Sequence, residues 1–293
     1  IVIGIIFFQY RKIGEMEKRI LGRSKKSPFY NVLTSTLFGL IGGILGSVIF
    51  IYLGTVINPE DFYFILPLAI LLSMINSRFI CFSYAGGIIS LLSLIFGYSN
   101  INVSGIMALV GVLHLVESFL ILVDGTKGKI PIFMEKQGEI IGGFTMNRFW
   151  PVPFIIFIDG SHIYPATIMA ILGYGDFALV NYPENKSRET AGVLFIFSII
   201  LISLSQLSTY YHTFKYAAAI FAPLCHELII AFSRKKEKKG SCIFTPSDHG
   251  VKILDTLPNG VGERMGLIPG NIILSINGNR IYTKRDIEDI LYF

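Results

Sequence analysis

The chain has 293 residues, of which 52% are hydrophobic and only 15% are charged, and its mean hydropathy is +0.61. A soluble globular domain carries about 25% charged residues, so this composition excludes an ordinary soluble protein and indicates a protein dissolved partly in a lipid bilayer. Three scattered cysteines argue against a disulfide framework and against a zinc site, and we expect neither a metal nor another cofactor.

The first part of the chain is divided into apolar stretches by short polar segments. A helix needs about 20 residues to cross the hydrocarbon core. About six transmembrane helices are therefore predicted, at residues 32–57, 62–76, 79–97, 103–123, 190–207 and 214–233. A further stretch at 152–181 is broken by Asp159-Gly160-Ser161-His162. It predicts a re-entrant segment, which enters and leaves on the same side. Residues 1–240 are thus expected to form a polytopic α-helical membrane domain.

Basic residues set the expected orientation of this domain. They cluster at 11–26, before the first long stretch, and at 234–239, after the last one. Lysine and arginine favour the cytoplasmic side, and an even number of crossings places both clusters there. The segments 11–31 and 124–151 are then cytoplasmic loops. The chain begins without Met, in an apolar run, and is expected to be a fragment cut at both ends.

The segment 124–151 has a pattern of its own. Strand-like runs at 129–136 and 140–146 are joined by Gln137-Gly138-Glu139, which predicts a β-hairpin. Trp150 then returns the chain to the bilayer and is suited to the membrane interface. The hairpin is either an ordered loop between helices or a docking surface for a partner.

After Ser241 the pattern changes to short strands and turns. Turns are predicted at 257–260, 269–271 and 277–278, and a short helix at 261–265 is ended by Gly266. Thr283 is the expected N-cap of a helix over 284–291, where Asp286 can close a capping box.

This segment resembles a known family. Gly250–Gly278, with Met265-Gly266-Leu267, Pro269-Gly270-Asn271 and Ile273-Leu274-Ser275-Ile276-Asn277-Gly278, is similar to the core of a bacterial PDZ domain. The first two motifs each differ from the family pattern at one residue. The resemblance implies an α+β PDZ-like domain over 241–293, incomplete at its C-terminus because the family's final strand would follow Phe293.

The resemblance also implies a peptide-binding groove. An extended ligand adds as a strand beside a sheet edge, and a helix forms the facing wall. A glycine in the ligand-binding loop lets a ligand approach closely. A terminal carboxylate, an internal peptide and a folded partner all remain open as ligands. The implied binding residues are His249, Gly250, Val251, Lys252, Ile253, Leu254, Ile287 and Ile290.

Several ionisable side chains fall within the apolar stretches, where each is costly unless it is paired or faces a cavity. They line a proton or ion path, or they satisfy one another. His226-Glu227 resembles half of a zinc-protease motif, but position 230 is Ile where a second His is required. These residues are His114, Glu117, Asp159, His162, His226 and Glu227.

The architecture as a whole, together with the stretch His114–Pro153, resembles the MinJ-type topological determinants of bacterial cell division. That resemblance implies a multi-pass scaffold of the cell membrane, at the septum or poles, whose cytoplasmic PDZ domain binds proteins of the DivIVA type and of the Min system. The basic segments suit anionic lipids rather than nucleic acid. The alternative is a membrane-embedded protease, or a regulator of one, with a PDZ substrate-binding module.

Overall fold

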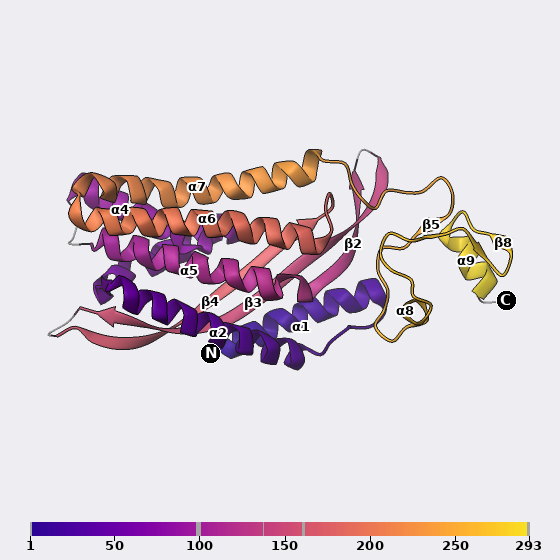
Figure 1. The fold of residues 1–293 in the computed structure, drawn as a ribbon, viewed down its shortest axis with the longest axis horizontal. Coiled ribbons are helices and arrows are strands. Elements are labelled where there is room, and N and C mark those ends of the chain that lie inside the picture. Colours follow the sequence, from indigo (N-terminus) through magenta and orange to yellow (C-terminus); the bar gives the residue numbers. More distant parts are fainter. Residues whose placement is uncertain (1, 98–100, 137, 160–161, 292–293) are drawn as a thin grey trace.

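The computed structural model describes residues 2–97, 101–136, 138–159 and 162–291. Long helices run side by side along the molecule, a sheet lies against them, and a small C-terminal module projects from one end (Figure 1). The helices of the body are α1 (Val2–Leu21), α2 (Pro28–Leu53), α3 (Phe62–Ile75), α4 (Phe82–Phe96), α5 (Val103–Asp124), α6 (Pro183–Tyr210) and α7 (His212–Lys239). Its strands are β1 (Val56–Ile57), β2 (Lys129–Lys136), β3 (Glu139–Ile158) and β4 (Tyr164–Ala178).

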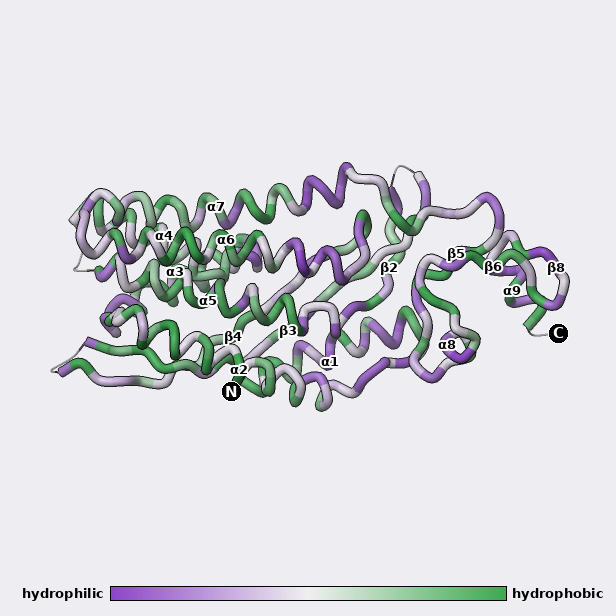
Figure 2. The backbone as a smooth tube through the Cα atoms, viewed as in Figure 1, coloured by the Kyte–Doolittle hydropathy of each residue, from purple (hydrophilic) through white to green (hydrophobic). Residues whose placement is uncertain are grey.

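Four helices among the described residues, namely α2, α5, α6 and α7, are long and apolar enough to cross a membrane. Hydrophobic residues fill most of these helices, whereas hydrophilic residues dominate the end of α7 and much of the C-terminal module (Figure 2). Helix α5 is the central one, with 72% of its apolar window buried inside the protein. Several apolar helices of this kind fit a membrane protein.

Helices α3 and α4 correct the expected count of six crossings. They have 14 and 15 residues, so each is about 21–23 Å long, against a hydrocarbon core of about 30 Å. A short 3₁₀ helix, η2 (Ser77–Ile80), joins them into a helical hairpin. Its tip reaches the middle of α5 and α7, where Cys81 contacts His114 and His226.

The expected re-entrant segment at 152–181 is an antiparallel β-hairpin instead. Strands β3 and β4 pair continuously, from Phe144 opposite Ala178 to Ile158 opposite Tyr164. Three prolines, Pro151, Pro153 and Pro165, lie in the paired region and disfavour a helix there. The predicted hairpin at 129–146 is confirmed, with Lys136 opposite Glu139. Gln137, Gly160 and Ser161 lie outside the described residues.

The prolines have a further role at the edge of β3 that faces α2. The carbonyl oxygens of Pro151 and Pro153 lie directly against Gly39 and Gly43 of α2. A strand edge without a partner strand leaves N–H groups unsatisfied, and proline has none. The next N–H on this edge, that of Ile155, donates to Ser47 Oγ at 2.9 Å. The sheet edge can therefore lie beside a helix without unpaired donors at these positions.

The two expected cytoplasmic loops are largely regular structure. The segment 11–31 continues helix α1 to Leu21 and begins helix α2, while 124–151 contains β2 and most of β3. Helix α1 is held by Tyr10, whose hydroxyl lies 2.5 Å from Ser35 Oγ and donates to the Phe149 carbonyl. Trp150 is buried rather than interfacial, because its indole N–H donates to Asp124 at 2.8 Å.

Candidate functional site

Two places in the molecule are candidates for function, and the first is the C-terminal module. It contains β5 (Val251–Lys252), α8 (Val261–Arg264), β6 (Ile272–Ile273), β7 (Ser275–Ile276), β8 (Asn279–Arg280) and α9 (Lys284–Leu291). The predicted turns are confirmed, since Asn259, Gly270, Asn277 and Gly278 all have positive φ. The short helix does end before Gly266, whose φ is +73°.

The capping box of α9 is also confirmed. Thr283 Oγ1 accepts from the N–H of Asp286 at 3.3 Å, and Asp286 Oδ2 accepts from the N–H of Thr283 at 2.8 Å. A second N–H, that of Tyr282, donates to the same carboxylate oxygen. These donors lower the pKa of Asp286 below its usual value. The ionised carboxylate thus satisfies two backbone groups ahead of the helix.

The strand predicted to offer a binding edge is already paired on one side. Val251 and Lys252 lie opposite Ile273 and Ile272, and Ile253 exchanges hydrogen bonds with Asn271 and Gly270. Hydrogen-bonding groups alternate in direction along a strand. Val251 and Ile253 therefore face β6, and the outward-facing groups belong to Lys252 and Leu254.

Gly250 has a structural reason of its own, beside the ligand approach predicted for it. Its φ is +111°, and a Cβ at this position would lie 2.3 Å from the carbonyl oxygen of Ile273. The glycine therefore allows the chain to enter β5, irrespective of any ligand. The preceding residue, His249, is exposed.

The module rests against the body through part of the predicted edge. Leu254 lies over Gly142 of β3, and Asp255 forms an ion pair with Lys25, which follows α1. Arg23 donates to the Pro258 carbonyl at 2.9 Å. The segment that follows β5 thus links the module to the body, and Leu254 is partly covered.

The facing wall of the groove remains a prediction. Ile287 and Ile290 are half-buried and three residues apart on α9, so they share one face of the helix. Several apolar side chains of the module are exposed to solvent, among them Met265 at 68% and Ile268 at 60% exposure.

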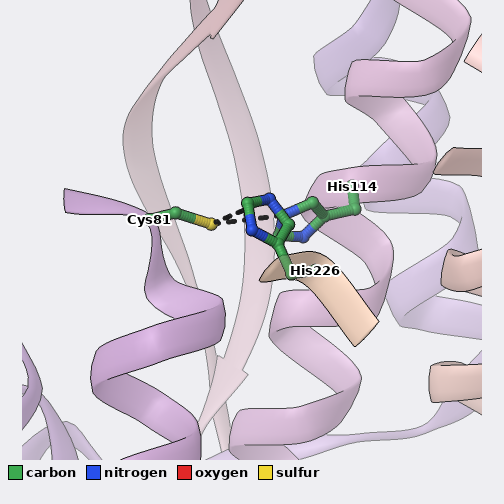
Figure 3. Close-up of side chains that lie close together, drawn as sticks. All are labelled: Cys81, His114 and His226. Atoms are coloured by element: carbon green, nitrogen blue, oxygen red, sulfur yellow. Dashed lines mark hydrogen bonds between the residues drawn. The ribbon is translucent and has the colours of Figure 1, made fainter. Parts of the chain in front are cut away.

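The second candidate site is a polar cluster in the middle of the helical body, in which His114 is buried and the other two residues are half-buried. His114 of α5 and His226 of α7 point toward each other, with ring centres 5.1 Å apart. Cys81, at the start of α4, completes the cluster: its Sγ lies 3.2 Å from His114 Nε2 and 3.8 Å from His226 Nε2 (Figure 3). The three ligand-type atoms all lie within 4.8 Å of one another.

A second layer of hydrogen bonds orients both rings. His114 Nδ1 lies 2.7 Å from the Val110 carbonyl, which can only accept, so Nδ1 carries the hydrogen. His226 Nδ1 lies 3.2 Å from the hydroxyl of Tyr84. Since that hydroxyl donates its hydrogen to Glu227 at 2.7 Å, it accepts from His226. Both Nε2 atoms therefore present lone pairs to Cys81.

Glu227 does not act with His226 on a common ligand. Its carboxylate is bound by the Tyr84 hydroxyl and by Arg78, whose Nη2 lies 3.0 Å away. Position 230 is Ile, so the zinc-protease pattern stays incomplete. Glu117 is half-buried one turn along α5 from His114.

The other predicted intramembrane residues are elsewhere. Asp159 and His162 are exposed at the far tip of the β3–β4 hairpin, away from the cluster, and the Asp159 N–H donates to the Ile57 carbonyl. Arg148 pairs with Asp124 and not with His114 or Glu117.

Cys81 is the residue that the sequence analysis missed. Scattering along the sequence does not keep such residues apart in the fold, since Cys81 meets two histidines that are 33 and 145 positions away. The available signal was two histidines near the centres of apolar stretches. Their third partner, Cys81, comes three residues after a short polar break at Asn76–Arg78.

Taken together, the chain is of a mostly helical class with several membrane-compatible helices, a long sheet and a small C-terminal module. Among curated proteins it is similar to the cell division topological determinant MinJ of Bacillus subtilis (strain 168), with 24% identity over 177 residues. That similarity covers 55% of this chain, which spans only about 45% of the length of that relative. No family model matches the sequence, and no solved structure matches it.

Proposed function

We propose that this protein is a membrane-anchored scaffold that helps to place the cell-division site. The observation that carries the proposal is the similarity to a cell division topological determinant, over more than half of the chain. The apolar helices supply an anchor that fits this role. A module at one end of the body supplies a surface for partners.

In this proposal the C-terminal module faces the cytoplasm and binds proteins, with DivIVA-like and Min-system proteins as the partners. The basic end of α7 and the basic part of α1 lie at the same end of the molecule as the module (Figures 1 and 2). Lysine and arginine favour the cytoplasmic side of a membrane, and they attract anionic lipids there. The body then spans the membrane several times.

The binding edge in this proposal is the outward side of β5. A partner segment would pair with the free backbone groups of Lys252 and Leu254, which alternate with those used by β6. Val251→Pro does not test this edge, because it would remove the backbone N–H of Val251, which faces β6. Lys252→Pro removes an outward N–H, whereas Lys252→Ala retains it.

The test combines localisation with partner capture. The full chain, tagged with a fluorescent protein in a rod-shaped bacterium, should form foci at septa or poles, and a uniform membrane signal would contradict the division role. Pull-down from the same cells should recover division proteins with the wild type and Lys252→Ala, and lose them with Lys252→Pro. Equal recovery with all three chains would exclude this edge. Labelling of Cys242 by an impermeant reagent in intact cells would exclude the cytoplasmic orientation.

A further inference from the structure

We propose that Cys81, His114 and His226 bind one zinc ion inside the helical body, as three protein ligands with water in the fourth position. This site is independent of the proposed scaffold role, which needs no metal. The three residues come from the tip of the α3–α4 hairpin and from the middles of α5 and α7 (Figure 3). One thiolate and two imidazoles are a ligand set typical of zinc.

The distances between ligand atoms agree with a shared ion. Zinc lies about 2.3 Å from a cysteine sulfur and about 2.0–2.1 Å from an imidazole nitrogen, so tetrahedral geometry places sulfur and nitrogen about 3.6 Å apart. The two Sγ–Nε2 distances, 3.2 Å for His114 and 3.8 Å for His226, lie on either side of that value. Small side-chain rotations suffice to bring all three atoms to one centre.

The hydrogen-bond pattern is that of ligands held ready for a metal. Metal-bound histidines commonly donate their other N–H to an oxygen, which fixes the tautomer and the ring plane. His114 does so to the Val110 carbonyl and His226 to the Tyr84 hydroxyl. Tyr84 is held in turn by Glu227.

The same contacts explain how the site can be stable without an ion. The Cys81 thiol has one hydrogen for two facing lone pairs. Ser83 Oγ, 3.3 Å from His114 Nε2, can supply the second hydrogen. We therefore expect a folded metal-free state that binds zinc reversibly, with loss of the thiol proton on binding.

The charge near the cluster also suits a divalent ion. Zinc with one thiolate retains a single positive charge, which is costly at membrane depth. Glu117 lies one turn along α5 from His114, and its carboxylate, when ionised, would offset that charge. Glu227, by contrast, is paired with Arg78.

An ion at this point would fasten the short α3–α4 hairpin to two long helices. Neither α3 nor α4 is long enough to span the membrane, so the hairpin depends on lateral contacts for its position. Glycines already allow close approach there, since a Cβ at Gly87 of α4 would lie 2.6 Å from Pro223 Cδ of α7. The zinc ion adds a bond between the same elements, at the hairpin tip.

The first experiment measures the metal content of the whole 293-residue chain. The wild type is purified in detergent, stripped with a chelator, loaded with Zn²⁺ and washed, and zinc is counted by mass spectrometry. We expect about one ion per chain for the wild type and for the controls Cys225→Ser and His212→Gln, which alter a thiol and an imidazole outside the cluster. Most of the bound zinc should be lost in each of three variants, Cys81→Ser, His114→Gln and His226→Gln, since three protein ligands are the usual minimum for a retained zinc ion.

The second experiment needs no change to the cluster, so a misfolded variant cannot confuse it. In a chain carrying Cys225→Ser and Cys242→Ser, Cys81 is the sole thiol. Its alkylation by N-ethylmaleimide should slow at least about tenfold when Zn²⁺ is added, because a bound thiolate is no longer free to react. Cobalt should give a thiolate-to-metal absorption band that disappears with zinc.

Three results would overturn the proposal. They are zinc in the wild type no higher than in Cys81→Ser, an alkylation rate unaffected by zinc, or copper(I) binding without zinc binding. If the wild-type chain binds zinc as expected but forms no foci at septa or poles, the scaffold role is contradicted and the zinc site is not.

Discussion

The carbonyl oxygen of Pro153 occupies the place where Gly43 would carry a side chain. A Cβ at that glycine would lie 1.9 Å from the oxygen, and Gly39, one turn earlier, has the same relationship to Pro151. Helix α2 therefore packs backbone against backbone on strand β3. Small residues allow such approach between elements in a membrane.

Gly43→Ala should destabilise the body by about 1–3 kcal/mol, the usual effect of overpacking. The added methyl group meets backbone, which cannot move aside as a flexible side chain can. Gly192→Ala on α6 is the control, because a Cβ there meets nothing within 4 Å. Thermal unfolding of both variants in the same detergent measures the difference. Equal transition temperatures would show that α2 and β3 are not in this contact.

Asp124→Asn should destabilise the protein much more, by about 3–5 kcal/mol, because it leaves a buried charge without its partner. Arg148 is 1% exposed, and its Nε donates to Asp124 at 2.8 Å. Glu15→Gln, which removes an exposed ion pair with Arg11, should cost under about 0.5 kcal/mol. Chemical unfolding of the two variants compares these effects. A small loss from Asp124→Asn would mean that Arg148 reaches solvent.

Asp61 should make stability depend on pH. Burial raises its pKa to about 6 from an ordinary value of 3.8. The folded state therefore prefers the protonated acid, and the resulting stability is full below about pH 4 and is lost as the pH rises through about 6. Asp61→Asn should lack this loss. Its melting temperature relative to wild type should thus rise between pH 4 and pH 6.5, and a constant difference over that range would contradict the assignment.

Thr283→Ala should loosen the start of α9 by removing one half of its capping box. Asp286→Asn should do so in a pH-dependent way. The pKa of Asp286 is lowered in the folded state, so its contribution is present above the ordinary pKa and is lost as the pH falls through the lowered one. Amide exchange of residues 284–291, compared at neutral pH and at about pH 3, measures both variants, and the effect of Asp286→Asn should shrink at the lower pH. Lys284→Ala, which leaves the box intact, is the control.

Local sequence patterns determined the local structure of this protein. The turn at Asn277-Gly278, the end of α8 before Gly266 and the Thr283–Asp286 box depend on the backbone preferences and hydrogen bonds of neighbouring residues, and all were predictable. Composition likewise indicated apolar helices, because the hydrophobicity of a stretch is the sum over its residues and needs no tertiary contact. The hairpin at 129–146 was predictable from two strand-like runs and the turn residues between them.

Tertiary structure alone decided how far each apolar stretch reaches and which polar groups meet. Residues 152–181 are as apolar as a membrane helix, yet their prolines and the glycines of α2 make a strand beside a helix the better packing. Cys81, His114 and His226 gain their significance only when a hairpin tip meets two long helices. Sequence separation carries no information about such contacts, because they result from helix lengths and packing rather than from any local pattern.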